Sequence, residues 1–206
     1  MPFCGEMQGL PKPYNLVAHS MGGCIGLRAL VAGLDVKSAV FTGPMWGIRI
    51  APHLRPVAAV FSRIMPMIGQ GLALTPGTTL DPYVLNEPFE TNTLTRSEAM
   101  YKMMRDQLVA HPELCLAGPS FTWLREALGE TKALATMPSP NIPCLTYLGT
   151  EEEIVHVGRI KDRMSRWPKG HLRMVEGGAH EVLMETSKKT APLYDEIVAF
   201  FARASD

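Results

Sequence analysis

The chain has 206 residues and a mass of 22.6 kDa, which suits a single domain. Twenty lysines and arginines balance twenty aspartates and glutamates, so the excess of cations that a nucleic-acid-binding face needs is missing. Hydrophobic residues make up 46% of the chain and charged residues 19%, which argues against disorder. The sequence contains no apolar run of the roughly 18 residues that a transmembrane helix requires and no secretory signal at its start.

Short apolar segments at residues 14–18, 38–42, 144–148 and 172–175 predict four strands. Their hydrophobic residues do not alternate cleanly with polar ones, which is typical of parallel strands buried on both faces. Helical patterns at residues 24–31, 157–166 and 193–204 separate or follow the strands, residues 19–23 read as a tight turn, and residues 3–8 resemble the end of a helix. This alternation predicts an α/β fold with a mainly parallel sheet.

Residues 44–142 interrupt the alternation and are too many for a loop, so we expect them to form a helical cap inserted between two strands. Thr95 and Glu98 have the spacing of a capping box that opens a helix ending near His111. Residues 121–135 predict another helix. We therefore divide the chain into a core of residues 1–43 and 143–206 and a cap of residues 44–142.

The strongest chemical signal is the segment Ala18-His19-Ser20-Met21-Gly22-Gly23 between a predicted strand and a predicted helix. The pattern small-x-Ser-x-Gly between a strand and a helix is typical of a nucleophile elbow. This sharp turn exposes the serine at the N-terminus of the helix. The backbone N–H of Met21 would then point to where an oxyanion forms. The alternative is a glycine-rich turn in which Ser20 has no chemical role.

A serine needs a general base and a group that orients the base. His180 follows the fourth predicted strand, at the edge of a parallel sheet where sites gather. The acidic run Glu151-Glu152-Glu153 follows the third strand, and one of its carboxylates could orient the imidazole. The alternatives are a structural loop histidine and a solvated acidic turn.

Residues 16–23 resemble the elbow of α/β-hydrolases of the monoacylglycerol lipase and lysophospholipase group. The tail at residues 175–185 resembles the lysophospholipase L2-like branch, and so do His111-Pro112-Glu113-Leu114, Gly118-Pro119 and Trp123-Leu124 in the cap. The resemblance covers nearly the whole chain from about residue 9 onward. It implies an α/β-hydrolase fold with a helical cap.

Carried over residue by residue, the resemblance makes Ser20 the nucleophile and His180 the general base. The family places its acid three residues after a strand-ending glycine, which here is Glu152 after Gly149, where aspartate is usual. Glu151 and Glu153 remain candidates for the acid. Ala18 stands where the family has glycine, a mild departure.

The family has several strands before its elbow strand, whereas this chain reaches its elbow at residue 20. The sequence thus resembles the C-terminal two-thirds of such an enzyme, and we expect a truncated product, a partial gene or one piece of an assembly. The strand at residues 14–18 would then be a sheet edge. The oxyanion hole would keep Met21 and lose the second amide that an early loop donates.

The resulting expectation is a serine hydrolase that cleaves a carboxylic ester, and the resemblance implies a lysophospholipid or monoacylglycerol. The alternatives are a small-ester esterase, a proline-type aminopeptidase, or a non-catalytic product. We expect no cofactor and no metal, because this reaction needs neither. The four cysteines (Cys4, Cys24, Cys115, Cys144) are widely spaced and lack CxxC spacing, which argues against a zinc site and suits free thiols in a reducing compartment. Free thiols predict a cytoplasmic protein, and the balanced charge predicts no nucleic-acid partner. Residues 54–74 are a candidate for peripheral contact with the inner membrane.

Overall fold

The structure is a computed structural model and describes residues 9 and 11–205. Its centre is a parallel sheet with the strand order β1-β2-β3-β4. The strands are β1 (Asn15–His19), β2 (Ser38–Thr42), β3 (Cys144–Gly149) and β4 (Gly170–Val175). The parallel sheet confirms the predicted α/β class, and each strand lies close to its predicted position. The predicted helix end at residues 3–8 lies outside the described residues.

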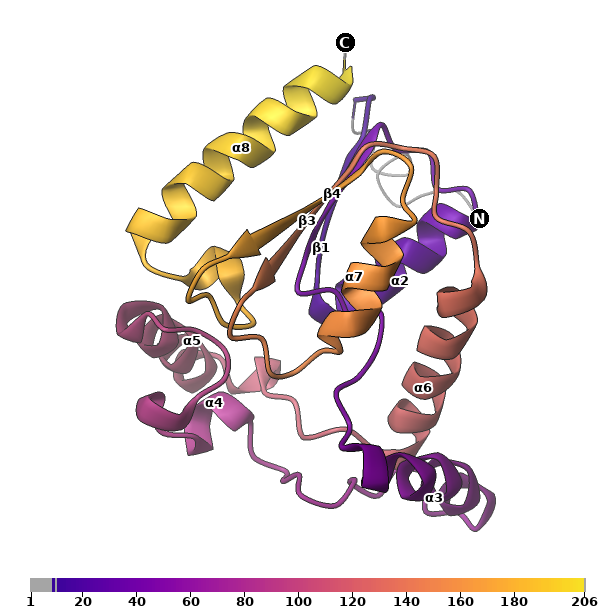
Figure 1. The fold of residues 1–206 in the computed structure, drawn as a ribbon. Helices are drawn as coiled ribbons and strands as arrows, with labels where there is room; N and C mark the ends of the chain where they lie inside the picture. The colour runs from indigo at the N-terminus through magenta and orange to yellow at the C-terminus, as the bar shows by residue number, and fades with distance from the viewer. Residues whose placement is uncertain (1–8, 10, 206) are drawn as a thin grey trace.

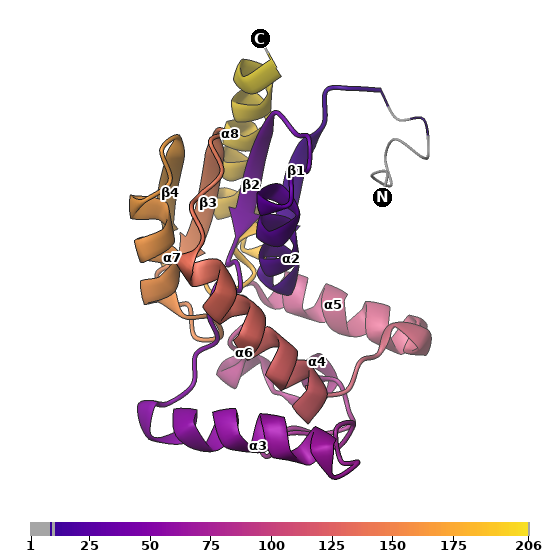
Figure 2. The same ribbon diagram turned by 90° about the vertical axis from the view of Figure 1, so that its right-hand side faces the viewer.

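Helices cover both faces of the sheet (Figures 1 and 2). One face carries α8 (Ser187–Ser205), and the other carries α2 (Ser20–Val31), α6 (Phe121–Thr136) and α7 (Val157–Ser165). Successive strand side chains point to opposite faces, so Val40 belongs to the core cluster under α8 whereas Phe41 belongs to the cluster under α2, α6 and α7. Because all four strands are parallel, their carboxyl ends lie at the same end of the sheet.

Two helices begin earlier than the sequence predicted. Helix α2 starts at Ser20, so most of the predicted turn at residues 19–23 is the first turn of the helix. Helix α8 starts at Ser187 rather than at 193 and contains Pro192. In both cases the prediction began the helix after a glycine pair or a proline, which the first turns of these helices accommodate.

β1 is an edge strand among the described residues, as expected. Its outward-facing Val17 is 53% exposed, and Ile25 on the adjoining helix is 61% exposed. Both belong to elements whose other side chains are mostly apolar and packed. The two exposed side chains lie on opposite faces of the sheet, because Val17 is in register with Val40, which packs under α8, whereas α2 covers the other face.

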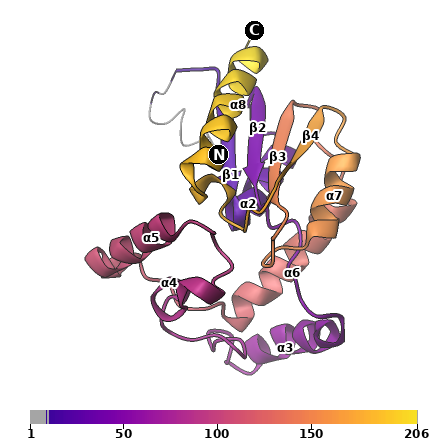
Figure 3. The same cartoon turned by 60° about the vertical axis from the view of Figure 1, so that its left-hand side comes forward.

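The segment between β2 and β3 is helical, as predicted, and is called the insert (residues 44–142) below. It contains α3 (Arg55–Met67), α4 (Tyr83–Asn86), α5 (Glu98–Ala110) and α6, with short 3-10 turns at Pro52–Leu54, Phe89–Thr91 and Pro112–Leu114. Figure 3 shows α3, α4 and α5 beyond the carboxyl ends of the strands, while α6 rises from α3 toward α2. The insert therefore lies over the edge of the sheet where loops gather.

The predicted capping box at Thr95 is wrong. Ser97 is the N-cap of α5 and accepts a hydrogen bond from the Met100 N–H at 3.4 Å. The Thr95 hydroxyl instead donates to the carbonyl of Met184 at 2.7 Å, so it links the insert to the loop after β4. The spacing of Thr95 and Glu98 fits a capping box, but the contact of Thr95 with a distant segment determines its position instead.

The carboxyl end of α6 is fixed to the core by a buried arginine. Arg163 on α7 donates hydrogen bonds to the carbonyls of Leu134 and Met137 and to the Ser139 hydroxyl. A cation suits the last carbonyls of a helix, which have no partner within it. Leu134 and Ala127 also belong to the main core cluster. The division at residues 142 and 143 stays a prediction, because α6 shares its apolar face with the core.

Candidate active site

Strand β1 passes directly into α2 at Ser20. This residue has a φ of +50°, and no other non-glycine residue of the described chain has a positive φ. Such a conformation costs free energy and persists only where the surroundings enforce it. Close packing does so here, because a Cβ on Gly23 would lie 2.6 Å from the Cβ of Pro44. The strained turn places the Ser20 side chain at the first turn of a helix.

His180 lies in the loop after β4 and is 2% exposed. Its Nε2 atom is 2.8 Å from the Ser20 Oγ atom. Gly43 leaves the space that the imidazole occupies, since a Cβ there would lie 3.1 Å from the His180 Nδ1 atom. The structure therefore brings together a serine and a histidine that are 160 residues apart in the chain.

Glu152 completes the hydrogen-bonded series. Its Oε2 atom is 2.7 Å from the His180 Nδ1 atom, and its side chain is fully buried. Its Oε1 atom accepts hydrogen bonds from the N–H groups of Ile154 at 2.7 Å and Val155 at 3.1 Å. Burial alone would raise the pKa of Glu152, but the hydrogen bond and charge of His180 and the two backbone donors hold that pKa below its ordinary value. The carboxylate is thus kept ionised beside the imidazole.

The other two glutamates of the acidic run are exposed and engage other partners. Glu151 accepts a hydrogen bond from the Arg96 Nε atom at 2.6 Å, and Glu153 lies 3.3 Å from an Arg49 nitrogen. Neither makes a contact with His180 within hydrogen-bond distance. Of the three carboxylates that the sequence left open, the geometry pairs Glu152 with the imidazole.

The loops that carry Glu152 and His180 cross at Gly149. A Cβ on this residue would overlap the carbonyl oxygens of Gly178 and Ala179. The Glu151 N–H donates to the Gly178 carbonyl at 2.9 Å, which fixes the crossing. The loop that carries Glu152 and the loop that carries His180 therefore pack against each other and fix the relative position of the two side chains.

A second histidine–glutamate pair lies beside the first. The His19 and His180 rings have centroids 4.8 Å apart. The His19 Nδ1 atom is 2.9 Å from the Thr42 hydroxyl, and its Nε2 atom lies 3.0 Å from a Glu181 carboxylate oxygen. Burial would raise the pKa of Glu181, but His19 and the charge of His180 hold it below its ordinary value. These contacts favour a supporting role for His19 under the imidazole of His180.

Glu185 lies at the end of the tail of residues 175–185 that resembles the lysophospholipase L2-like branch, and the sequence analysis assigned it no role. Its side chain is fully buried, and it accepts hydrogen bonds from the N–H groups of Ala179 at 2.9 Å and Arg96 at 3.1 Å. Ala179 precedes His180, and Arg96 belongs to the insert. The Glu181 N–H also donates to the Leu94 carbonyl at 2.7 Å. A glutamate four residues past the histidine of the motif was the available signal, but its distant partners were not visible in the sequence.

Met21 lies where the sequence predicted it, in the first turn of α2. Its backbone N–H is one of the helix-initial donors that lack a partner within the helix. Its side-chain sulfur is 3.3 Å from the indole Nε1 atom of Trp123 on α6. The α2 N-terminus thus offers a donor next to Ser20, under the first turn of α6.

Within residues 9 and 11–205, no group of three or more His, Cys, Asp or Glu side chains has the arrangement of a metal site. The described cysteines Cys24, Cys115 and Cys144 are unpaired, and burial raises the pKa of Cys24 to about 11. Cys4 lies outside the described residues. None of the described helices is long and apolar enough to cross a membrane.

Comparisons with known proteins agree with this fold. A probable lysophospholipase L2 from Haemophilus influenzae is 28% identical over 180 residues, which are 83% of this chain and 54% of that protein. A monoacylglycerol lipase from Paleococcus ferrophilus superposes with a TM-score of 0.69 at 17% identity, covering 97% of this chain and 71% of that one. A soluble variant of monoglyceride lipase from Saccharomyces cerevisiae gives a TM-score of 0.68 at 17% identity, covering 98% and 65%.

The chain therefore spans about half the length of the curated relative that it matches. The structural similarity confirms the predicted α/β-hydrolase fold, and the relative confirms the predicted resemblance to lysophospholipases. The family model described as serine aminopeptidase, S33, matches residues 5–187. On this evidence the chain belongs to the S33 serine aminopeptidase family of α/β-hydrolases.

Proposed function

We propose that this protein is a serine hydrolase that cleaves a carboxylic ester, with Ser20 as nucleophile, His180 as general base and Glu152 as the acid that orients it. The observation that carries the proposal is the unbroken series of contacts from Glu152 to His180 at 2.7 Å and from His180 to Ser20 at 2.8 Å. Series of this kind activate serine on several unrelated folds.

In the proposed reaction His180 takes the hydroxyl proton as Ser20 attacks the ester carbonyl. The Met21 N–H donates to the resulting oxyanion. His180 then protonates the leaving alcohol, which leaves an acyl group on Ser20. A water molecule, deprotonated by His180, attacks the acyl-enzyme and releases the carboxylic acid. Glu152 keeps Nδ1 protonated and stabilises the imidazolium at both stages.

For the substrate we propose a lysophospholipid or a monoacylglycerol. The similarity to a probable lysophospholipase and to two monoacylglycerol lipase folds supports this class. The description of the matching family supports an aminopeptidase as the second candidate. The two differ in the bond cleaved, an ester or an amide, and the same three side chains could serve either.

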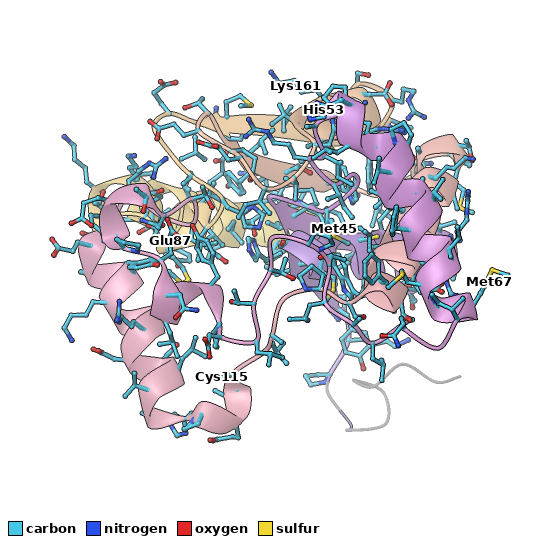
Figure 4. The ribbon with its side chains drawn as sticks, turned by 90° about the horizontal axis from the view of Figure 1, so that it is seen from below. Met45, His53, Met67, Glu87, Cys115 and Lys161 are labelled. Atoms are coloured by element: carbon cyan, nitrogen blue, oxygen red, sulfur yellow. The ribbon has the colours of Figure 1, made fainter. Side chains whose placement is uncertain are left out.

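We further propose that α3 contacts a lipid surface. A stripe of exposed apolar side chains, called the α3 stripe, follows the helix with the spacing of a single face, and its members are Val57, Val60, Phe61, Ile64, Met67 and Ile68. Figure 4 shows Met67 pointing away from the rest of the molecule. Arg55 and Arg63 lie on the same helix, as in interfacial amphipathic helices.

The hydrolase proposal is tested with a fluorophosphonate probe and with p-nitrophenyl esters of increasing acyl length. We expect labelling of the parent chain, no labelling of Ser20→Ala, and a rate that increases with acyl length. A proline p-nitroanilide serves as the amide substrate. Faster cleavage of the anilide than of the esters would favour the aminopeptidase over the lipid hydrolase. A parent chain that is folded but not labelled would contradict both proposals.

The lipid contact is tested by sedimentation with phosphatidylcholine vesicles. The double substitution Phe61→Ser with Ile64→Ser should reduce the bound fraction. The matched control is Val109→Ser with Val198→Ser, which removes two exposed apolar side chains from α5 and α8. Equal binding of the two double variants would contradict the contact.

A further inference from the structure

A groove of about 690 Å³ opens between α3, α6 and the start of α7. Its lining includes Trp46 and Ile48 from the loop after β2 and His156 from the loop between β3 and α7. Ser20, Glu152 and His180 do not line it, so it is a separate space from the candidate active site. Its volume falls within the range of small-molecule sites.

The groove is lined by cations from three helices. Arg55 and Arg63 come from α3, Arg125 and Lys132 from α6, and Arg159 from α7. The single carboxylate in the lining is Glu126, which is paired with the neighbouring Arg125 at 2.6 Å. Four permanent positive charges in the lining therefore remain without a carboxylate in salt-bridge distance among the described residues.

The surrounding sequence adds to this imbalance. No residue from 43 to 80 is acidic, although this stretch includes Arg49, Arg55 and Arg63. Cations gathered in one concave space repel each other, and the repulsion is relieved when an anion enters. The whole chain is electrically neutral, so the excess belongs to this groove and not to the general surface.

Two glycines line the groove. A Cβ on Gly129, in the middle of α6, would meet no atom within 4 Å, so this position faces empty space. Glycine inside a helix costs stability relative to alanine. A Cβ on Gly47 would be 2.8 Å from the Arg159 Cγ atom. The Arg159 side chain thus lies directly over a residue without a side chain.

We infer that this groove binds a phosphate group, carried either by a small phosphate ester or by a phospholipid headgroup. Several arginines suit phosphate because each guanidinium can donate two parallel hydrogen bonds to the phosphate oxygens. A phosphate monoester adds a second negative charge to this match, and a phospholipid diester offers the same oxygens with a single charge. The inference concerns binding alone and does not depend on hydrolysis at Ser20.

The test measures binding in proteins that all carry Ser20→Ala, so that turnover cannot interfere. One arm titrates glycerol 3-phosphate by calorimetry, and the other sediments the protein with phosphatidylcholine vesicles with and without phosphatidylglycerol. The test variant adds Arg63→Gln with Lys132→Gln. The matched control adds Arg105→Gln with Lys188→Gln, which removes the same charge from α5 and α8.

We expect the test variant to bind at least about tenfold more weakly and the control variant to bind as the parent does. Binding of glycerol 3-phosphate assigns the groove to a free phosphate ester. Binding that occurs only with vesicles containing phosphatidylglycerol assigns the groove to a lipid headgroup. Vesicles of phosphatidylcholine alone measure the binding that the α3 stripe contributes. Absence of binding in both arms, or equal loss in the two double variants, overturns the inference. Circular dichroism checks folding, and Arg159→Gln on α7 provides an independent variant.

Discussion

Two regions of this molecule use charge in opposite ways. The loops at the candidate active site contain buried carboxylates, Glu152 and Glu185, that accept hydrogen bonds from backbone N–H groups. Residues 43–80, which contain α3, include no acidic residue and expose the α3 stripe beside Arg55 and Arg63, which have no carboxylate of the described residues within salt-bridge distance.

The difference indicates how tightly each region is held. The loop around His180 is tied to the insert by hydrogen bonds from Arg96 and Glu181. Helix α3 is held mainly by packing against α6, and among its residues only Ser62 is buried. We therefore expect substitutions at the site loops to cost activity and stability, and substitutions on the outer face of α3 to cost neither.

The largest effect should come from Glu152→Gln. An amide cannot stabilise an imidazolium as a carboxylate does and can favour the wrong tautomer, so kcat/KM toward a fluorogenic ester should fall by roughly 10³–10⁴. Glu153→Gln, at an exposed neighbour, should change it less than about twofold. If both variants lose activity equally, Glu152 has no special relation to His180.

Glu185→Gln should give the next largest effect. Both carboxylate oxygens accept from the Arg96 N–H and Oε1 also accepts from the Ala179 N–H, so an amide nitrogen in place of Oε2 would leave a buried donor opposed to the Arg96 donor. We expect the free energy of unfolding to decrease by about 2–4 kcal/mol in urea titrations. Glu176→Gln, an exposed position near the same loop, is the control. An unchanged midpoint for Glu185→Gln would show that the tie between loop and insert carries little stability.

Acid should weaken the site loops selectively. The folded pKa of Glu152 is lower than its ordinary value of 4.5, so its stabilising contribution is complete above about pH 4.5 and disappears as the pH falls through the lowered pKa. Each unit by which the pKa is lowered contributes about 1.4 kcal/mol. Thermal melts from pH 6 to pH 3 should show a steeper loss of stability in the parent than in Glu152→Gln. Parallel curves would contradict the lowered pKa.

The smallest effect should come from the α3 stripe. Phe61→Ser with Ile64→Ser removes side chains that are about half exposed, at 49% and 48%. Substitutions at such surface positions change stability by about 0.5 kcal/mol or less. The same urea titration measures this change. A loss comparable to that of Glu185→Gln would mean that the stripe packs against other parts of the protein.

Much of the fold was predictable because its signals are local. The strands are short apolar runs buried on both faces, and the elbow motif depends on contiguous residues around Ser20. The family resemblance, which places the acid three residues after Gly149, favoured Glu152 while Glu151 and Glu153 stayed open, and the structure pairs Glu152 with His180.

The features that were missed depend on contacts between distant segments. Thr95 binds the Met184 carbonyl rather than capping α5, and Glu185 binds an N–H of the insert. The groove draws its cations from helices that span residues 55–165, so no single window of the sequence contains it. The start of α2 was missed because Ser20 combines a strained φ with a helical position.

The attachment of α6 has a consequence for the design of chimeric enzymes. Arg163 binds the carbonyl end of this helix, and Leu134 is part of the core. A graft that exchanges all of residues 44–142 with a relative would replace both the helix end that Arg163 binds and the core side chain of Leu134. A graft that ends at Pro119, before α6, would keep both and would carry only α3, α4 and α5 to the new host.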